Sequence, residues 1–249
     1  MVFDSYLQQL EQRHFANLTF SEVTRALRAL SSAYVERRES ALADHKALEG
    51  AGKRAAFALY YGPLHFLLVQ HIMRELNAPL APGVVVDLGC GTGVAGAAIA
   101  TSVTPALDVV GFDTHPWTLD EARFTYKAFG LHADVRRAHA GTVRFPKNTS
   151  IVVAAFVVNE LKEKDRNALL DQLIGNRGPG SASRPHVLVI EPISQRISPW
   201  WDDWAGTFEK LGGRNDIWKA RVETPMTIKR LAKSSGLRPD MLTARSLFL

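Results

Sequence analysis

Apolar residues recur at helical spacing within the first eighty residues of the chain. After residue 19 they follow one another at intervals of three and four, which places them on one face of a helix. Thr19 and Glu22 have the spacing of a capping box, so this helix should begin at residue 20. A second helix is predicted over 54–76, with Pro63 dividing or kinking it. The apolar face of the first helix comprises Phe20, Val23, Leu27, Leu30 and Tyr34.

Beyond the stretch "NAPLAPG", the pattern changes to short apolar runs rich in β-branched residues. Such runs are typical of parallel strands that are covered on both faces. Helical segments alternate with them, and this alternation predicts an α/β fold with a doubly wound, mostly parallel sheet. We therefore expect an N-terminal helical lid or substrate subdomain at 1–79 and a sheet domain at 80–249. The predicted strands are 84–88, 107–112, 150–157, 186–190 and the final "LTARSLFL".

Signals for helix ends lie between these apolar runs. Thr118 and Glu121 have capping-box spacing, which predicts a helix that stops near Gly130. Thr224 should cap another helix, with Pro225 at its first position. Further helices are predicted over 165–175 and 225–236. The stretch "PWWDDW" begins one more amphipathic stripe, which we expect to pack on the sheet and which comprises Trp200, Trp204, Phe208 and Leu211.

The stretch "GVVVDLGCGTGVAG", residues 83–96, combines the first predicted strand with a glycine-rich loop. In a doubly wound sheet, the loops at the carboxyl ends of the strands bind the ligand. Glycine lets the backbone come close to that ligand, and the next helix points its free N–H groups toward it. A tight turn alone would need a single glycine. The loop therefore predicts a nucleotide-like ligand.

Asp87 ends the first strand and bears on which nucleotide is bound. Two unit charges about 4 Å apart repel by about 4 kcal/mol at an effective dielectric constant of ~20, so a carboxylate here disfavours the diphosphate of NAD. S-adenosylmethionine brings an ammonium, a carboxylate and a sulfonium group instead, which suit an acid beside exposed N–H groups. Asp113 ends the second strand, where an acid can accept both ribose hydroxyls, but this contact would serve NAD equally well.

Together, "VVDLGCGTGVAG" and "GFDTHPWTLDEAR" resemble the first two motifs of class I S-adenosylmethionine-dependent methyltransferases. His115 stands where that family has a serine, and His139 stands where it has an acid or polar group near the adenine amine. The resemblance implies a seven-stranded sheet that ends in an antiparallel hairpin, with S-adenosyl-L-methionine as cofactor. The cofactor-binding residues that it implies are Asp87, Gly89, Cys90, Gly91, Gly93, Asp113, Thr114 and His139.

Asn159 and Glu160, in "VVAAFVVNEL", follow the fourth strand, where a group that acts on the substrate belongs. We hypothesise that both are catalytic and that Glu160 is a general base. Alternatively, Asn159 caps the next helix and Glu160 complements its dipole. The Asn/Asp-Pro-Pro-aromatic form of this motif is absent, which disfavours methylation of adenine N6 or glutamine. Tyr61 and His65, beside the Pro63 break, are candidate substrate-binding residues; alternatively, their helix simply packs on the sheet domain.

The single cysteine, Cys90, excludes an intramolecular disulfide framework and a multi-cysteine zinc site. It lies in the glycine loop, so we interpret it as a small loop residue rather than a catalytic thiol, and we expect no metal. The chain begins without a basic and then apolar leader, and no apolar run reaches the ~18 residues of a membrane span. A cytoplasmic protein without a membrane partner is expected.

Positive charge gathers near the C-terminus, where residues 207–249 hold nine Lys or Arg and four Asp or Glu, so that this stretch accounts for the net charge of +5. Such a surface either meets RNA phosphates or is merely solvated. The stretches "AAFVVNEL" and "VLVIEP" are also similar to methyltransferase-like proteins associated with the small ribosomal subunit, which implies ribosomal RNA as acceptor. The chain lacks that family's four-cysteine cluster, and Gly62 replaces its arginine. A small-metabolite methyltransferase and a non-catalytic cofactor-binding assembly factor remain as alternatives.

Overall fold

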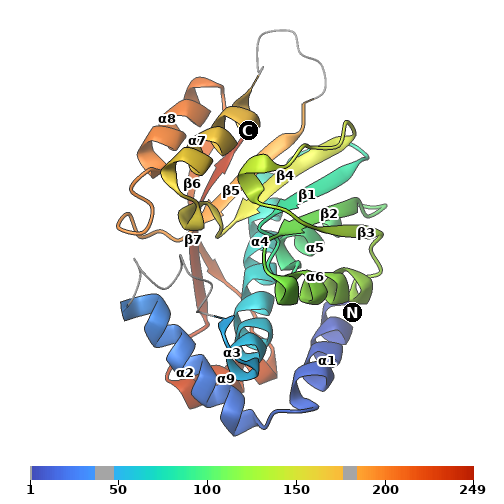
Figure 1. Ribbon diagram of the computed structural model, residues 1–249, viewed down its shortest axis with the longest axis vertical. Coiled ribbons are helices and arrows are strands. Elements are labelled where there is room, and N and C mark those ends of the chain that lie inside the picture. Colours follow the sequence, from blue (N-terminus) through green and yellow to red (C-terminus); the bar gives the residue numbers. More distant parts are fainter. Residues whose placement is uncertain (1, 37–47, 176–183) are drawn as a thin grey trace. The chain divides into compact units, whose positions relative to one another are not determined.

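The computed structural model describes residues 2–36, 48–175 and 184–249 (Figure 1). Contacts within the chain divide it into two compact units. Unit 1 comprises Met1–Leu68 and Ala220–Leu242, and unit 2 comprises Val69–Lys219 and Thr243–Leu249. The sequence placed a single boundary after residue 79, whereas the contacts join a C-terminal stretch to the N-terminal helices. This stretch lies far from them in sequence, so no local signal could reveal the association.

Unit 1 is helical, and α2 and α9 pack side by side in it (Figure 1). The predicted capping box is confirmed, because the Thr19 backbone N–H donates to the Glu22 carboxylate (2.7 Å) and the Glu22 N–H donates to the Thr19 hydroxyl (3.3 Å). The predicted apolar face is buried at Val23, Leu27 and Leu30. The side chain of Tyr34 and residues 37–47 lie outside the described residues. The helices are α1 (Val2–Phe15), α2 (Phe20–Glu36), α3 (Ala51–Ala56), α9 (Met226–Ser235) and the first part of α4 (Gly62–Leu76).

The expected break at Pro63 is confirmed, and its form is a π-helical turn, η2, over Phe57–Tyr61. Pro63 lies in the first turn of α4, where a residue without an N–H is tolerated. The π-helical turn lies between α3 and α4, and such turns usually occur singly within α-helices.

Most of the sheet lies in unit 2, and within the described residues it has seven strands in the order β3-β2-β1-β4-β5-β7-β6. The pairs β1–β2, β1–β4, β2–β3 and β4–β5 are parallel, and β5–β7 is antiparallel. The predicted fold class is confirmed, including the doubly wound and mostly parallel sheet. The strands are β1 (Val84–Leu88), β2 (Asp108–Asp113), β3 (Ala133–Arg137), β4 (Thr149–Ala155), β5 (His186–Glu191), β6 (Arg214–Arg221) and β7 (Met241–Phe248).

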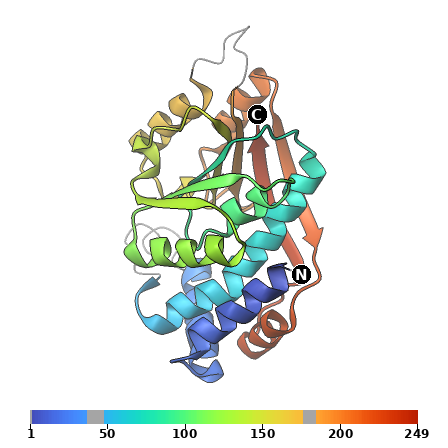
Figure 2. The ribbon, with the colours of Figure 1, turned by 90° about the vertical axis from the view of Figure 1, so that its right-hand side faces the viewer.

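The apolar pattern did not predict β6, because this strand lies at the edge of the sheet, where only part of a strand is buried. Figure 2 shows it in orange along that edge. Ile217 is 71% exposed, and most of the other β6 positions are polar. An edge strand need not be a continuous apolar run, so its sequence carries a weaker signal.

The two faces of the sheet have different cover. Val84, Val86 and Leu88 join a buried cluster with residues of α7 (Glu163–Ile174) and α8 (Trp201–Lys210). Asp87 points to the other face, where it meets α5 (Val94–Ala100) and α6 (Pro116–Ala128). Asp87 therefore lies under the helix that follows the glycine loop.

The tryptophan-rich stripe is buried as predicted at Trp200, Trp204 and Phe208, but Leu211 is 39% exposed, so its assignment to the core is wrong. Leu211 caps the C-terminus of α8, where the helical periodicity ends. Trp201, which the stripe left out, is also buried.

Two predicted helix starts are wrong by one to three residues. The N-cap of α6 is His115, whose ring Nδ1 accepts from the Trp117 N–H (3.1 Å), while the Thr118 hydroxyl donates to the His115 carbonyl. The N-cap of α9 is Pro225, without a side-chain cap, rather than Thr224. Both helices otherwise occur as predicted, and Gly236 ends α9 with φ +74°.

Candidate functional site

The glycine loop connects β1 to α5 in a conformation that its first glycine makes feasible. Gly89 has φ +61°, and a Cβ added to it would lie 2.2 Å from Cγ2 of Val157. A side chain is therefore excluded at Gly89 both by backbone conformation and by space. Gly91 also has positive φ (+53°), but the nearest atom to an added Cβ is the Gly89 carbonyl oxygen at 3.9 Å. The loop thus has no space for a side chain at Gly89, where Val157 after β4 contacts it, but it has space at Gly91.

Asp87 is buried to 1% exposure, and its carboxylate faces the protein interior. It accepts hydrogen bonds from the Gly96 N–H (2.8 Å) and the Tyr126 hydroxyl (3.0 Å). A Cβ at Gly96 would lie 2.7 Å from this carboxylate, so the missing side chain makes the contact feasible. Desolvation raises the pKa of Asp87 to about 7, the two hydrogen bonds oppose the rise, and the charge of Asp113 adds to it. Asp87 thus anchors α5 and Tyr126 of α6, and its predicted role toward a cofactor stays a prediction.

Asp113 is the last residue of β2, next to the glycine loop, and it is only partly buried. Its Oδ2 accepts from the Gly91 N–H and its Oδ1 from the His115 N–H, each at 2.9 Å. One carboxylate thus ties the glycine loop to the start of α6. Its remaining lone pairs can accept hydroxyl donors from a ligand.

The other predicted cofactor residues surround the same edge of the sheet. The Thr114 carbonyl accepts from Nε of Arg137 (3.1 Å), and His139 Nδ1 accepts from the Gly141 N–H (3.4 Å). Cys90 is buried, and desolvation raises the pKa of its thiol well above the usual value. Since a thiol nucleophile needs a lowered pKa, Cys90 has the environment of a packed loop residue. The sequence did not identify Arg137 as a partner of Thr114, because a charged residue at the end of an edge strand has no sequence signal of its own.

Asn159 is held by a network that the sequence did not reveal. Glu191, at the end of β5, accepts from the backbone N–H groups of Val158 (2.9 Å) and Asn159 (3.2 Å), and its second oxygen accepts from the Asn159 amide. The side-chain Oδ1 of Asn159 accepts from the indole N–H of Trp200 (3.0 Å). The alternative that Asn159 caps the next helix is wrong, because Asn159 lies in the 3-10 turn Val158–Glu160 and the N-cap of α7 is Lys162.

Glu191 is fully buried, and desolvation raises its pKa to about 8. The hydrogen bonds from Asn159 and Val158 oppose this rise, whereas the charge of Glu160 adds to it and that of Arg245 opposes it. The Arg245 guanidinium lies 4.3 Å from the ring centroid of Trp201. A buried acid with three donors is a fixed scaffold for the residues beside it.

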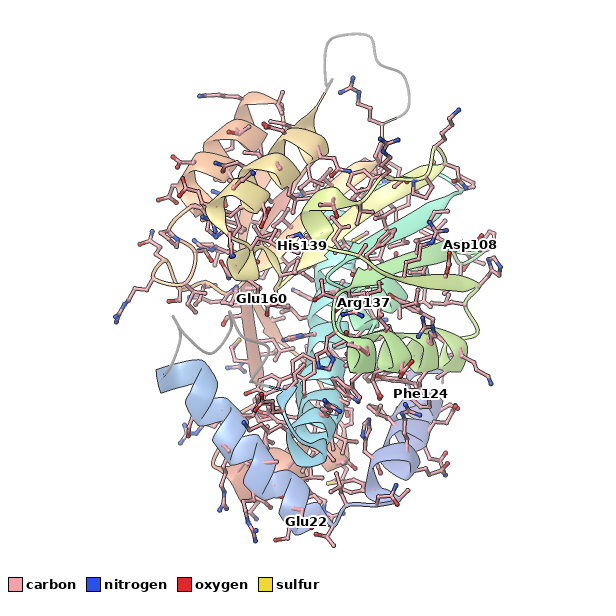
Figure 3. All side chains as sticks on the ribbon, in the orientation of Figure 1. Glu22, Asp108, Phe124, Arg137, His139 and Glu160 are labelled. Carbon is pink, nitrogen blue, oxygen red and sulfur yellow. The ribbon has the colours of Figure 1, made fainter. Side chains whose placement is uncertain are left out.

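Glu160 follows Asn159 and is accessible to solvent, although protein atoms crowd around its carboxyl group. Desolvation raises its pKa to about 7, and the charge of Asp113 raises it further. This carboxyl group therefore lies within electrostatic reach of Asp113. Figure 3 shows Glu160, His139 and Arg137 at the carboxyl edge of the sheet, and Asp108 at the opposite edge. A group with this pKa can take up a proton near neutral pH.

Tyr61 and His65 belong to unit 1, so their role toward a substrate stays a prediction. Their rings lie 6.2 Å apart, and Tyr61 also makes an edge contact with Tyr60. Desolvation lowers the pKa of His65 to about 4 and raises that of Tyr61. Both side chains are therefore uncharged at neutral pH.

Within 2–36, 48–175 and 184–249, no group of three or more His, Cys, Asp or Glu could hold a metal ion. In the same part of the chain, no helix has the length and apolar character needed to cross a membrane.

Comparisons with known proteins found one matching family model and similar solved structures. A family model described as a methyltransferase domain matches residues 85–180. A putative O-methyltransferase from Nostoc punctiforme is 15% identical, with a TM-score of 0.55, covering 92% of this chain and 69% of that one. A SAM-dependent methyltransferase from Aquifex aeolicus is 16% identical (TM-score 0.48, 74% and 90% covered). A putative RNA methyltransferase from Pyrococcus horikoshii is 15% identical (0.47, 75% and 82%). No curated protein matches the chain.

Proposed function

We propose that this chain is an S-adenosylmethionine-dependent methyltransferase and that it methylates RNA. The observation that carries the RNA acceptor is the position of the C-terminal cations. Of the nine Lys or Arg in residues 207–249, eight are exposed and only Arg245 is buried. Exposed cations in excess over acids attract the phosphates of a nucleic acid. The expected cytoplasmic location is part of this proposal.

The residues at the loop suit S-adenosylmethionine. Open space in front of Gly91 lets the ligand approach the backbone, and Asp113 presents free lone pairs beside it. We assign the ribose hydroxyls to Asp113 and the region of the adenine to Thr114 and His139. The buried Asp87 favours the cationic end of the cofactor through its charge. Gly89, Gly93 and Cys90 shape the loop without offering a side chain that reaches far.

The cofactor supplies an activated methyl group, so the protein contributes mainly alignment and proton uptake. The Glu160 carboxyl group, which is within electrostatic reach of Asp113, accepts the proton that the acceptor nitrogen or oxygen loses. Asn159 is fixed by Glu191 and Trp200, and it orients the acceptor by hydrogen bonding. The uncharged Tyr61 and His65 are proposed to contact the acceptor base.

The test is transfer of a radiolabelled methyl group from S-adenosylmethionine to total RNA or to a small-metabolite extract. Label in the RNA fraction is expected, with transfer falling steeply as salt is raised, because counterion release drives association with RNA. Label confined to the metabolite fraction would make the RNA acceptor wrong while leaving the methyltransferase activity intact. Binding of the cofactor without transfer to either fraction would favour an assembly factor.

A further inference from the structure

Unit 1 contains a cavity that includes none of the candidate site residues. It has a volume of about 320 Å³, which is in the range of small-molecule sites. Within the unit it lies where α2 meets the C-terminal end of α9, two helices that run side by side (Figure 1). We name it the α2–α9 pocket, and its lining residues are Phe20, Ser21, Thr24, Arg25, Arg28 and Ser234.

The two arginines of the α2–α9 pocket have different partners. Nε and Nη2 of Arg28 both donate to the Ser234 carbonyl, the first at 3.1 Å, so this guanidinium is fixed over the carbonyl end of α9. Arg25 is exposed and forms no ion pair within the described residues. Glu22 lies within electrostatic reach of Arg25, but its carboxylate is occupied by the backbone and hydroxyl of Thr19. Arg25 is therefore a cation available to a ligand.

Polar and aromatic groups complete the α2–α9 pocket. Thr24 is 7% exposed, and its hydroxyl, although buried, has no hydrogen-bond partner in the described part of the chain. A buried hydroxyl without a partner costs free energy, which a ligand that accepts from it would recover. The Arg230 guanidinium lies 4.9 Å from the ring centroid of Phe20, so a third cation stands next to a lining residue.

These groups match a phosphate. A guanidinium offers paired donors to phosphate oxygens, and hydroxyl groups add single donors. Exposed cations on the adjoining face of α9, Lys229 and Lys233, extend the positive charge beyond the pocket. We propose that the α2–α9 pocket binds a backbone phosphate of the RNA, with Arg25 and Arg28 as charged donors and Thr24 as a neutral one. This inference rests on the proposed RNA acceptor and adds a second contact region, in unit 1.

The test is binding of a short fluorescein-labelled single-stranded RNA to the full chain, followed by fluorescence anisotropy over a range of salt concentrations. Arg25→Gln removes one exposed cation and should weaken binding about tenfold. It should also reduce the slope of log affinity against log salt by about 0.7, the value for one phosphate contact with a single strand. Lys127→Gln is the matched control, because it removes one exposed cation from α6 in unit 2. Binding to this control should stay within about twofold of the parent.

Thr24→Val separates a built site from a mere patch of charge, because it keeps the volume of the side chain and the net charge. We expect weaker RNA binding by a few fold, with an unfolding temperature equal to or above that of the parent. If Thr24→Val binds RNA as tightly as the parent, or if Arg25→Gln behaves like Lys127→Gln, the pocket proposal is overturned.

Methyl transfer distinguishes this failure from failure of the proposed function. If RNA is methylated and Arg25→Gln binds it normally, the acceptor is right and the pocket is wrong. If no RNA is methylated but RNA binding still depends on Arg25 and Thr24, the pocket is right and the RNA acceptor is wrong.

Discussion

The carboxyl ends of β1 and β2 and those of β4 and β5 lie at one edge of the same sheet, yet they are organised differently. At the first pair, Asp87 accepts from the Gly96 N–H in the first turn of α5. Asp113 accepts from the Gly91 N–H of the glycine loop and from the His115 N–H at the start of α6. At the second pair, Glu191 and Trp200 hold the Asn159 side chain from both sides. In the first region most of the donors are backbone N–H groups, joined by the Tyr126 hydroxyl. In the second region the Asn159 side chain is held by side chains 32 and 41 residues away.

The largest effect is expected from Gly89→Ala, which tests how strictly backbone geometry governs the first region. Positive φ costs about 1–2 kcal/mol, and the overlap with Val157 adds roughly 1–3 kcal/mol, so we expect a loss of about 3–4 kcal/mol in unfolding free energy. Gly91→Ala is the matched control, since its φ is also positive but its added Cβ has open space. Urea denaturation measures both variants. Equal losses would show that contact with Val157 is not the limiting feature.

Glu160→Gln addresses the chemistry assigned to the second region. Loss of a general base should lower kcat about 100-fold, which corresponds to about 2.7 kcal/mol. The affinity for S-adenosylhomocysteine, measured by calorimetry, should stay unchanged, because the glycine loop is intact. Glu163→Gln is the control, as this exposed acid begins α7 three residues further on. Full turnover of Glu160→Gln would remove Glu160 from the mechanism.

Asp113→Asn addresses the first region again. Asparagine retains one acceptor oxygen, so the bond to either the Gly91 or the His115 N–H is lost along with the charge. A hydrogen bond to a charged group contributes about 1.5–3 kcal/mol, so cofactor affinity should fall roughly 30-fold. Calorimetry with S-adenosylhomocysteine gives this value, and Asp120→Asn, an exposed position on α6, should bind normally. Unchanged affinity in the Asp113 variant would contradict its assignment to the ribose.

The pH dependence of stability compares the two regions through their buried acids. Asp87 has its pKa raised from 3.8 to about 7, and Glu191 from 4.5 to about 8, so the folded chain retains protons that the unfolded chain has already lost. The stabilising contribution of each acid is complete below the unfolded pKa, near 4, and is lost as pH rises to 7 or 8. Each group changes the unfolding free energy by at most about 1.4 kcal/mol per pH unit.

Urea denaturation across this pH range, with Asp87→Asn and Glu191→Gln, measures the two contributions separately. Each variant should reduce the fall of the unfolding free energy with pH, Asp87→Asn between about 4 and 7 and Glu191→Gln between about 4.5 and 8. Added S-adenosylmethionine should reduce the pH dependence that Asp87 contributes more than the one that Glu191 contributes, since the positive charge of the cofactor lowers the pKa of a nearby acid. A decline that neither variant alters would show that both acids are ionised throughout.

The difference between the regions also explains how much the sequence could predict. The strands β1, β2, β4, β5 and β7 and the glycine loop carry their signals within a few residues, so periodicity and motif spacing located them. The sequence also located Asp113, because this acid directly follows the apolar run of β2. Asn159 was found by its place after β4, and the alternative that it caps the next helix was wrong.

Glu191 and Trp200 were missed as site residues because their importance depends on tertiary contact. Glu191 ends an apolar strand, and Trp200 belongs to an apolar stripe that predicts only core packing. Their hydrogen bonds to Asn159 join positions 32 and 41 residues apart. Such pairings arise only once β4 and β5 are adjacent and α8 covers them.

Trp200→Phe gives the smallest expected effect and tests this missed network directly. It keeps an aromatic ring in the core but removes the N–H that donates to Asn159, at a cost of about 1 kcal/mol. Trp201→Phe is a matched control in the adjacent residue, because it removes an indole bond of 3.2 Å to Asn215. Both variants should lose similar stability in urea, whereas only Trp200→Phe should lower kcat, by a few fold. If both variants turn over equally, the orientation of Asn159 does not limit methyl transfer, and the second region is a structural scaffold only.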